Sequence, residues 1–360
     1  MARISLPDDI ATWLAAQASA LDRDGAVASS LLPQLGRAGL FTIGAPKRFG
    51  GDGAQTTEAI EAIAAVSEIS LAAGFVFWGH RTYLEYLLQS PNEALRDRLA
   101  PPIVRGEVAG ATALSNAMKF LAGLEGLQIE AREKQGRFLL DGKMPWVTNL
   151  RKEGFHVAAA VARQDGSSFI VSLRHDVPGL VRSPDLDLLA MRATNTAAVT
   201  LAGVEITDED IIAPDAQAWL PAVRPAFLGL QCGMSIGLAR RALNEALAAV
   251  GAGRSVLSPE IDALSQRLAT ETQRLHSGVS QSKFQADPAA LFRIRIALAD
   301  IVSEAVELEL QAGGGACYLS QPGEHFARRW REAAFIPVVT PSLVQLKAAL
   351  AAQAALGRAA

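Results

Sequence analysis

The amino-acid sequence predicts an α+β multidomain protein in which a central β domain separates two helical parts. The 360 residues exceed the usual size of one domain, so two or three packed units are expected. Apolar residues recur at helical spacing towards both ends, whereas in the middle they alternate with polar residues. We therefore expect a helical domain over residues 1–108, a β domain over 109–215 and a helical bundle over 216–360.

The first hundred residues predict helices joined by a glycine-rich loop. An apolar stripe runs through residues 31–40, and residues 59–71 and 75–88 repeat at helical spacing. The glycines of residues 46–53, PKRFGGDG, interrupt any helix and predict a turn between two helices.

Strands are expected from about residue 110 onward. Residues 127–131 alternate, KQG at 134–136 predicts a turn, and residues 138–140 alternate back. Further strands are expected at the remaining alternating runs, which turn residues separate: 155–162, 168–173 and 198–206.

Helical periodicity returns after Pro214 in long segments. They cover roughly residues 219–250, 259–281 and 288–312, and an apolar tail follows at 335–355. Long helices joined by short loops pack as a bundle.

Composition excludes several classes of function. A net charge of -3 with 20% charged residues gives no basic footprint for nucleic acid. No run of about 18 apolar residues predicts a membrane span, and no export signal is recognised. Cys232 and Cys317 stand far apart, so neither a disulfide framework nor a metal site is expected. A cytoplasmic protein that binds a small molecule or another copy of itself fits this composition.

Four short motifs, in this order along the chain, resemble those of the acyl-CoA dehydrogenase superfamily. They are LGRAGL at 35–40 with FGG at 49–51, DGKMPWVTN at 141–149, MRATNT at 191–196, and QAGGGACY at 311–318 with REA at 331–333. The resemblance implies a β-barrel-like central domain and a C-terminal four-helix bundle. It also implies an FAD cofactor, hydride transfer from an acyl thioester or related small molecule to flavin N5, and a homodimer or homotetramer.

In this resemblance, Trp146 and Thr148 match the residues that contact the flavin ring. An indole at a strand end can lie against a flat tricyclic ring and exclude water from one face. Leu114 and Ser115 stand where the family has a Leu-Thr pair beside the flavin pyrimidine. The alternative is that Trp146 fills the β-domain core and that Thr148 only satisfies its strand.

A second set of cofactor residues is implied near the end of the chain. Gln311, Gly314 and Gly315 fit a turn along which the adenosine half of a neighbouring subunit's FAD lies, and Arg254 stands one position from the family's arginine. The alternative is a glycine-rich helix C-cap. Residues 118–121, MKFL, replace a glycine-rich family segment, and bulky residues cannot bring backbone amides as close to a ligand.

The carboxylate that removes the α-proton in acyl-CoA dehydrogenation has no counterpart at its usual position. No Asp or Glu occurs from residue 333 to 360, and none in PAFL at 225–228, where some members place it. The chain therefore resembles a divergent member that lacks the usual Glu. His80 and Glu85 are candidates on a helix expected to wall the pocket, unless His80 is a packing residue and Glu85 a surface charge. Thr340 stands near the missing Glu, but its hydroxyl needs a strong neighbouring base.

His325 is expected to belong to a solvated charged segment together with Arg328, Arg329 and Arg331.

Three functions remain open. The chain is a dehydrogenase with an unidentified electron acceptor, a two-component flavin monooxygenase fed by a flavin reductase, or a non-catalytic flavin-binding or assembly protein of the same fold.

Overall fold

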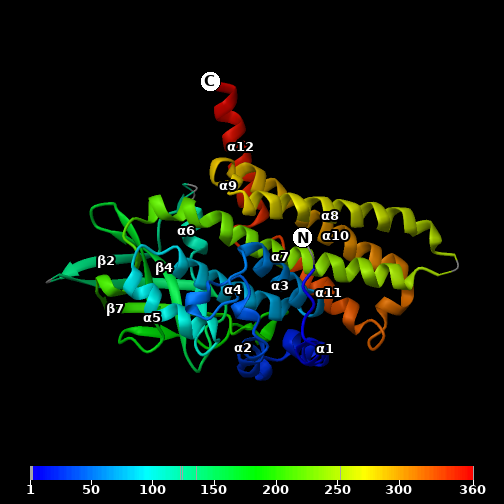
Figure 1. Ribbon diagram of the computed structural model, residues 1–360, viewed down its shortest axis with the longest axis horizontal. Coiled ribbons are helices and arrows are strands. Elements are labelled where there is room, and N and C mark those ends of the chain that lie inside the picture. Colours follow the sequence, from blue (N-terminus) through cyan, green and yellow to red (C-terminus); the bar gives the residue numbers. More distant parts are fainter. Residues whose placement is uncertain (1–2, 122, 124, 135, 252, 360) are drawn as a thin grey trace.

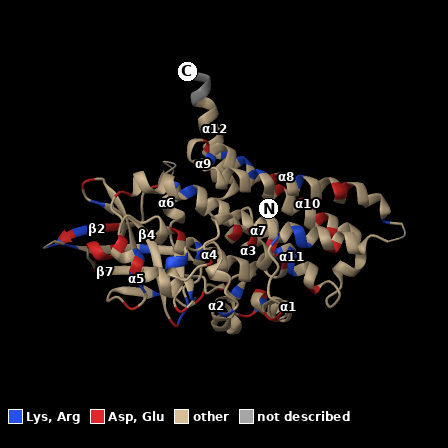
Figure 2. Cartoon of the chain, in the orientation of Figure 1, with Lys and Arg blue, Asp and Glu red and all other residues tan. Residues whose placement is uncertain are grey.

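The α, β, α order of the chain is confirmed in the computed structural model, which describes residues 3–121, 123, 125–134, 136–251 and 253–359 (Figure 1). The sheet lies at one end of the molecule, and the long C-terminal helices extend away from it. Basic and acidic residues occur along the same helices and strands (Figure 2). No helix in the described ranges combines the length and apolarity needed to cross a membrane.

Five helices precede the sheet: α1 (Asp8–Arg23), α2 (Ala28–Arg37), α3 (Thr56–Ile69), α4 (Leu71–Leu88) and α5 (Glu93–Val104). The predicted turn at residues 46–53 lies between α2 and α3, where Gly50 and Gly53 adopt positive φ angles of 91° and 82°. Such angles suit glycine because it lacks a Cβ atom.

Helix α4 is the central element of the fold, because nearly every one of its residues is buried. It packs against α3, against α7 of the C-terminal part and against strand β1. Two tyrosines fasten it to the sheet: the Tyr83 hydroxyl bonds Ser172 at 2.7 Å, and the Tyr86 hydroxyl bonds Thr112 at 2.8 Å. Side chains from α4 therefore reach the junction between helices and sheet.

The central part contains one short helix, α6 (Ser115–Leu121), and eight strands: β1 (Ala109–Thr112), β2 (Ile129–Lys134), β3 (Arg137–Val147), β4 (Phe155–Arg163), β5 (Ser168–Arg174), β6 (Leu180–Arg182), β7 (Ala197–Ile206) and β8 (Ile211–Ala213). Their order is β6-β7-β3-β2-β4-β5-β8. Strand β1 lies outside this path and pairs in parallel with β4, which also pairs with β2. Strands β2 and β3 form the predicted hairpin, in which Lys134 pairs with Arg137. Gln135, predicted in its turn, lies outside the described residues.

The expectation of a β-barrel-like domain is wrong, because the sheet is open. Within the described ranges, β6 pairs only with β7, and β8 pairs only with β5. Both end strands have three residues, and closure of a barrel requires the two end strands to pair with each other. Short end strands also limit pairing with other chains.

Six helices follow the sheet: α7 (Ala216–Ala249), α8 (Ser258–Ser280), α9 (Lys283–Ala286), α10 (Pro288–Gly313), α11 (Glu324–Phe335) and α12 (Leu343–Ala359). Helices α7, α8 and α10 run side by side (Figure 1). Helix α7 also packs against α3, and glycines allow the close approach: a Cβ added at Gly233 would lie 2.7 Å from the Ile60 carbonyl oxygen, and one at Gly237 would collide with the Ala64 carbonyl.

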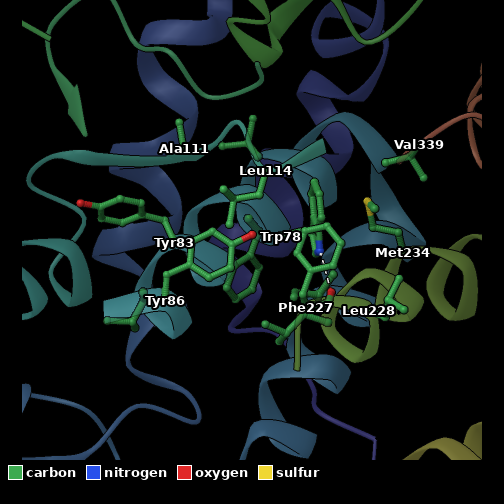
Figure 3. Packing of buried hydrophobic residues seen from close by; sticks show 14 of the residues in the cluster. Trp78, Tyr83, Tyr86, Ala111, Leu114, Phe227, Leu228, Met234 and Val339 are labelled. Atoms are coloured by element: carbon green, nitrogen blue, oxygen red, sulfur yellow. Dashed lines mark hydrogen bonds between the residues drawn. The ribbon is translucent and has the colours of Figure 1, made fainter. Parts of the chain in front are cut away.

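The hydrophobic core continues from α4 into α7 (Figure 3). The Trp78 indole N–H donates to the Phe227 carbonyl at 3.4 Å, and the two rings pack edge to face with centroids 5.4 Å apart. Val339, which follows α11, belongs to the same cluster. The N-terminal and C-terminal helices thus share one core beside the sheet.

Candidate functional site

A cavity of about 590 Å³ opens where the sheet meets helices α4 and α11. One wall comes from the sheet side: the end of β1, helix α6, residues 143–148 of β3 and its continuation, and the loop at 188–196. The other wall comes from α4, from the end of α11 and from residues 338–340. A ligand in this cavity contacts both halves of the fold.

Trp146 and Thr148 lie on the sheet wall. The Trp146 side chain is 66% exposed, so its indole is not part of the core of the β domain. The Thr148 hydroxyl donates to the Thr194 carbonyl at 3.2 Å and accepts from the Thr196 hydroxyl at 3.1 Å. These bonds hold the loop at 188–196 against the end of β3.

The same loop is held in an unusual backbone conformation. Met191 and Asn195 flank a short 3-10 turn with φ angles of 54° and 47°. Non-glycine residues seldom adopt this left-handed region, and they cost free energy there. The Met191 N–H donates to Oδ1 of Asp22 at 3.0 Å, so a carboxylate of α1 stabilises the turn.

Helix α6 also contributes residues to the sheet wall of the cavity. Ser115 lines the cavity at the start of this helix, whereas Leu114 is fully buried beneath it. Asn116 binds two residues that follow the helix in sequence. Its Nδ2 donates to Glu125 at 2.7 Å, and its Oδ1 accepts from the Gln128 N–H at 3.0 Å. The bulky residues 118–121, which replace the glycine-rich family segment, therefore lie in helix α6.

The helical wall is apolar and aromatic. The rings of Phe75 and Trp78 lie parallel with centroids 5.5 Å apart, and Phe335 meets Phe75 edge to face at 4.8 Å. Beyond α11, Val338 and Val339 also line the cavity. The Thr340 carbonyl is held from behind by Gln231, whose Nε2 donates to it at 2.9 Å.

Ionisable groups on the cavity wall are few. Among the described lining residues, Glu125 is the one carboxylate, and Lys119, Lys143 and Arg331 are the cations. Hydrogen bonds from Asn116, and then from Lys119, lower the pKa of Glu125. A carboxylate so stabilised in its charged form is a poor proton acceptor near neutral pH.

Comparison with known proteins shows which family the N-terminal helices match and which solved structures share the fold. Residues 8–107 match the family "Acyl-CoA dehydrogenase, N-terminal domain". The chain is 28% identical over 189 residues to mitochondrial isovaleryl-CoA dehydrogenase of Pongo abelii, a match that spans 50% of this chain and 44% of the relative. It is 25% identical over 339 residues to the probable acyl-CoA dehydrogenase YngJ of Bacillus subtilis, covering 91% of this chain and 80% of the relative. The chain thus spans less than half the length of the first relative.

The fold is similar to that of butyryl-CoA dehydrogenase from Megasphaera elsdenii, with a TM-score of 0.79 and 15% identity over 98% of this chain and 99% of that one. The chain has the acyl-CoA dehydrogenase fold. The same fold is seen in KijD3 in complex with FMN (TM-score 0.80, 21% identity, 97% and 91% covered). It is also seen in dibenzothiophene monooxygenase from Paenibacillus sp. A11-2 (TM-score 0.72, 18% identity, 94% and 94% covered).

Within this acyl-CoA dehydrogenase fold, His80 and Glu85 lie outside the cavity wall. The His80 Nε2 lies 2.8 Å from the Ile103 carbonyl, and its Nδ1 accepts from the Gly110 N–H at 3.1 Å. Burial lowers the pKa of His80 to about 4, so its ring is neutral at pH 7. Glu85 pairs with Arg81 at 2.8 Å. His80 thus links α4 to α5 and β1, Glu85 bonds within α4 and its C-cap, and neither side chain lines the cavity.

The second set of predicted cofactor residues lies at the opposite end of α7. Arg254 follows this helix, donates to the Ala312 carbonyl at 2.5 Å and covers Gly314, which caps α10. Phe227 stands at the cavity end, and the 1.5 Å rise per residue separates it from the last turn of α7 by roughly 33 Å. The structure therefore brings Ser115, Trp146, Thr148 and Thr340 to one cavity, and it leaves Arg254, Gln311, Gly314 and Gly315 at another place.

The expectation of a solvated segment around His325 is wrong for two of its arginines. Arg328 and Arg329 are 4% and 3% exposed. Arg328 pairs with Glu332 at 3.0 Å, and Arg329 pairs with Glu309 of α10. A run of charges on a helix can face a buried acid as well as water, and the sequence did not identify these partners.

Proposed function

We propose that the cavity binds a flavin and that the chain is a flavin-dependent oxidoreductase. The observation that carries the proposal is the exposed indole of Trp146, which lies beside the Thr148 hydroxyl on the sheet wall. None of the described aromatic rings packs against this indole. An exposed flat ring on a cavity wall fits a flat ligand such as the isoalloxazine of FAD.

The flavin would supply hydride acceptance at N5, or oxygen chemistry in its reduced form. The residues of the chain would position it: Trp146 would cover one face and exclude water, and Ser115 would offer a hydroxyl from the start of α6. Thr148 donates to the Thr194 carbonyl, so its hydroxyl must rotate before it can donate to a flavin atom. The Thr196 hydroxyl would keep it in place by donating to its oxygen.

The first candidate reaction is hydride transfer from an acyl thioester or related small molecule, as the names of the relatives suggest. It needs a base over the substrate, and the helical wall offers no carboxylate or histidine among its described lining residues. Glu125 on the sheet wall is a poor proton acceptor, so the base would have to come from a second molecule. A soluble protein would take the electrons onward.

The second candidate is monooxygenation by a reduced flavin that a separate reductase supplies. The absence of an acid from the described part of the helical wall favours it, because this reaction needs no α-proton abstraction. Dibenzothiophene monooxygenase shows that the fold also occurs in an oxygenase. A non-catalytic flavin-binding or assembly role is the third possibility.

The visible spectrum of the purified protein tests the flavin site first. Bound FAD, or saturable FAD uptake by the apoprotein, supports the proposal, and no uptake refutes it. Anaerobic bleaching of the flavin by acyl-CoA identifies the dehydrogenase. Faster aerobic oxidation of supplied reduced flavin, with product formed from an added substrate, identifies the oxygenase.

A further inference from the structure

We propose that the helical side of the cavity takes an uncharged, ring-bearing substrate with one hydrogen-bond-acceptor oxygen, and that Arg331 recognises this oxygen. The inference rests on the proposed function, because the substrate would lie between the flavin on Trp146 and the wall formed by α4 and α11. It adds a substrate class and a specificity residue to that site.

One face of α11 supplies both the donor and the apolar surface. Arg331, Ala334 and Phe335 are three and four residues apart, which places them on the same side of a helix. All three line the cavity, and Val338 extends the line beyond the end of α11. The backbone positions of Arg331 and Phe335 are thus about one turn apart.

The Arg331 guanidinium is fixed by a buried carboxylate. Its Nε donates to Oδ2 of Asp22 at 3.1 Å, its Nη2 donates to the same oxygen, and Asp22 is fully buried. The other oxygen of Asp22 accepts from Met191, on the opposite wall. One carboxylate therefore sets the position of Arg331 relative to the loop at 188–196.

The remaining nitrogen of Arg331 is available to a ligand. Among the described residues, Nη1 has no hydrogen-bond partner, and the side chain is 23% exposed beside the cavity. A guanidinium held by two of its nitrogens can donate from the third without losing side-chain freedom. An acceptor oxygen at this end of the cavity would complete its hydrogen bonding.

The charges favour a neutral acceptor over a carboxylate. Asp22 already balances the charge of Arg331, and the surrounding wall is apolar. A ligand carboxylate beside Arg331 would lose its hydration without gaining an unpaired cation on the helical wall, because the other lining cations, Lys119 and Lys143, belong to the sheet wall. This loss of hydration is unfavourable. A ketone, amide, ether or similar oxygen loses less hydration and can still accept from Nη1.

The rings on the wall favour a ring in the ligand. Phe75 and Trp78 present a parallel pair, and Phe335 stands edge-on to it. If a flavin lies on Trp146 opposite these rings, flat surfaces would bound the space between the walls. Aromatic pairs gain attraction beyond the area that they bury, so a planar substrate uses this space best.

Three naphthalenes test the inference on the FAD-loaded protein: 2-acetylnaphthalene, 2-ethylnaphthalene and 2-naphthoate. Their dissociation constants are measured by calorimetry or by the shift of the flavin absorption band. A hydrogen bond from a charged donor is expected to make the acetyl compound bind about tenfold tighter than the ethyl compound, which has the same ring and the same number of carbons but lacks the oxygen. Naphthoate is expected to bind more weakly than the acetyl compound.

Two variants separate recognition from folding. Asp22→Asn keeps an acceptor for the Met191 N–H but leaves the charge of Arg331 unbalanced, so naphthoate should gain affinity over the parent. Asp22→Asn combined with Arg331→Met removes the donor without orphaning a charge, and the preference for acetyl over ethyl should disappear. Glu61→Gln, which breaks a buried ion pair with Arg240 away from the cavity, is the control and should keep the parent preferences.

Equal binding of the acetyl and ethyl compounds by the parent overturns the inference, and this comparison needs no variant. So does a preference that survives in the double variant, or FAD-loaded protein that binds none of the three. A parent protein that takes up no FAD instead refutes the proposed function itself, which the flavin spectrum reports before any naphthalene is added.

Discussion

Replacing Trp146 with alanine should weaken flavin binding without unfolding the chain. A tryptophan side chain presents up to about 250 Å² of surface, and two-thirds exposure leaves roughly 165 Å² of it open. A flavin that covers one face would bury about half of this, or roughly 80 Å². At about 25 cal/mol per Å², the lost contact is worth about 2 kcal/mol, which corresponds to roughly 30-fold in the dissociation constant.

The assay is titration of apoprotein with FAD, followed by the absorption of the bound flavin, with thermal unfolding of both apoproteins as the test of folding. Trp330→Ala is the matched control, because Trp330 is also partly exposed but does not line the cavity. FAD affinities that agree within twofold between parent and Trp146→Ala would show that the indole does not carry the flavin. A large loss of affinity in Trp330→Ala would show that the effect is not local.

Three further outcomes are expected. If the chain lacks only a base, Val339→Glu or Thr340→Glu on the cavity wall should raise acyl-CoA dehydrogenation by about 10²-fold or more; no flavin bleaching by any acyl-CoA, and no thermal protection by it, would argue against a thioester substrate. The buried His80 has a folded pKa of about 4 against 6.5 unfolded, so its contribution to stability is complete above pH 6.5 and is lost as the pH falls towards 4. Between pH 7.5 and 5.0 the parent should lose about 2 kcal/mol that His80→Gln does not lose, measured by urea unfolding, and parallel pH curves would contradict this. Light scattering should show a homodimer or homotetramer, and a monodisperse monomer that retains FAD would refute a flavin site shared between subunits through Gln311.

Much of the fold could be predicted from the sequence, because the spacing of apolar residues in long segments indicates whether each is a helix or a strand. The three long C-terminal helices and the hairpin of β2 and β3 follow from apolar spacing alone. Strands β1, β6 and β8 could not be predicted, since three or four residues are too few to show a period of two. Whether the sheet closes depends on which end strands pair, and no local pattern encodes that.

The site could be predicted where one motif holds its residues together. Trp146 and Thr148 stand two positions apart, and the structure places both on the cavity wall. The pair of Asp22 and Arg331 could not be predicted, because 309 positions separate its members and each looks like an ordinary surface charge. His80 misled for the opposite reason: a titratable ring suggests chemistry, whereas two backbone partners occupy both of its nitrogens.

The glycine contacts between α3 and α7 have a consequence for mutational tolerance near the cavity. Gly233 and Gly237 let the two backbones touch, so even one methyl group there would wedge the helices apart. Phe227 lies on the same helix, α7, and accepts a hydrogen bond from Trp78, which lines the cavity. A substitution at Gly233 or Gly237 that leaves the protein folded would thus shift Phe227 and Trp78. It would alter substrate preference although neither glycine lines the cavity.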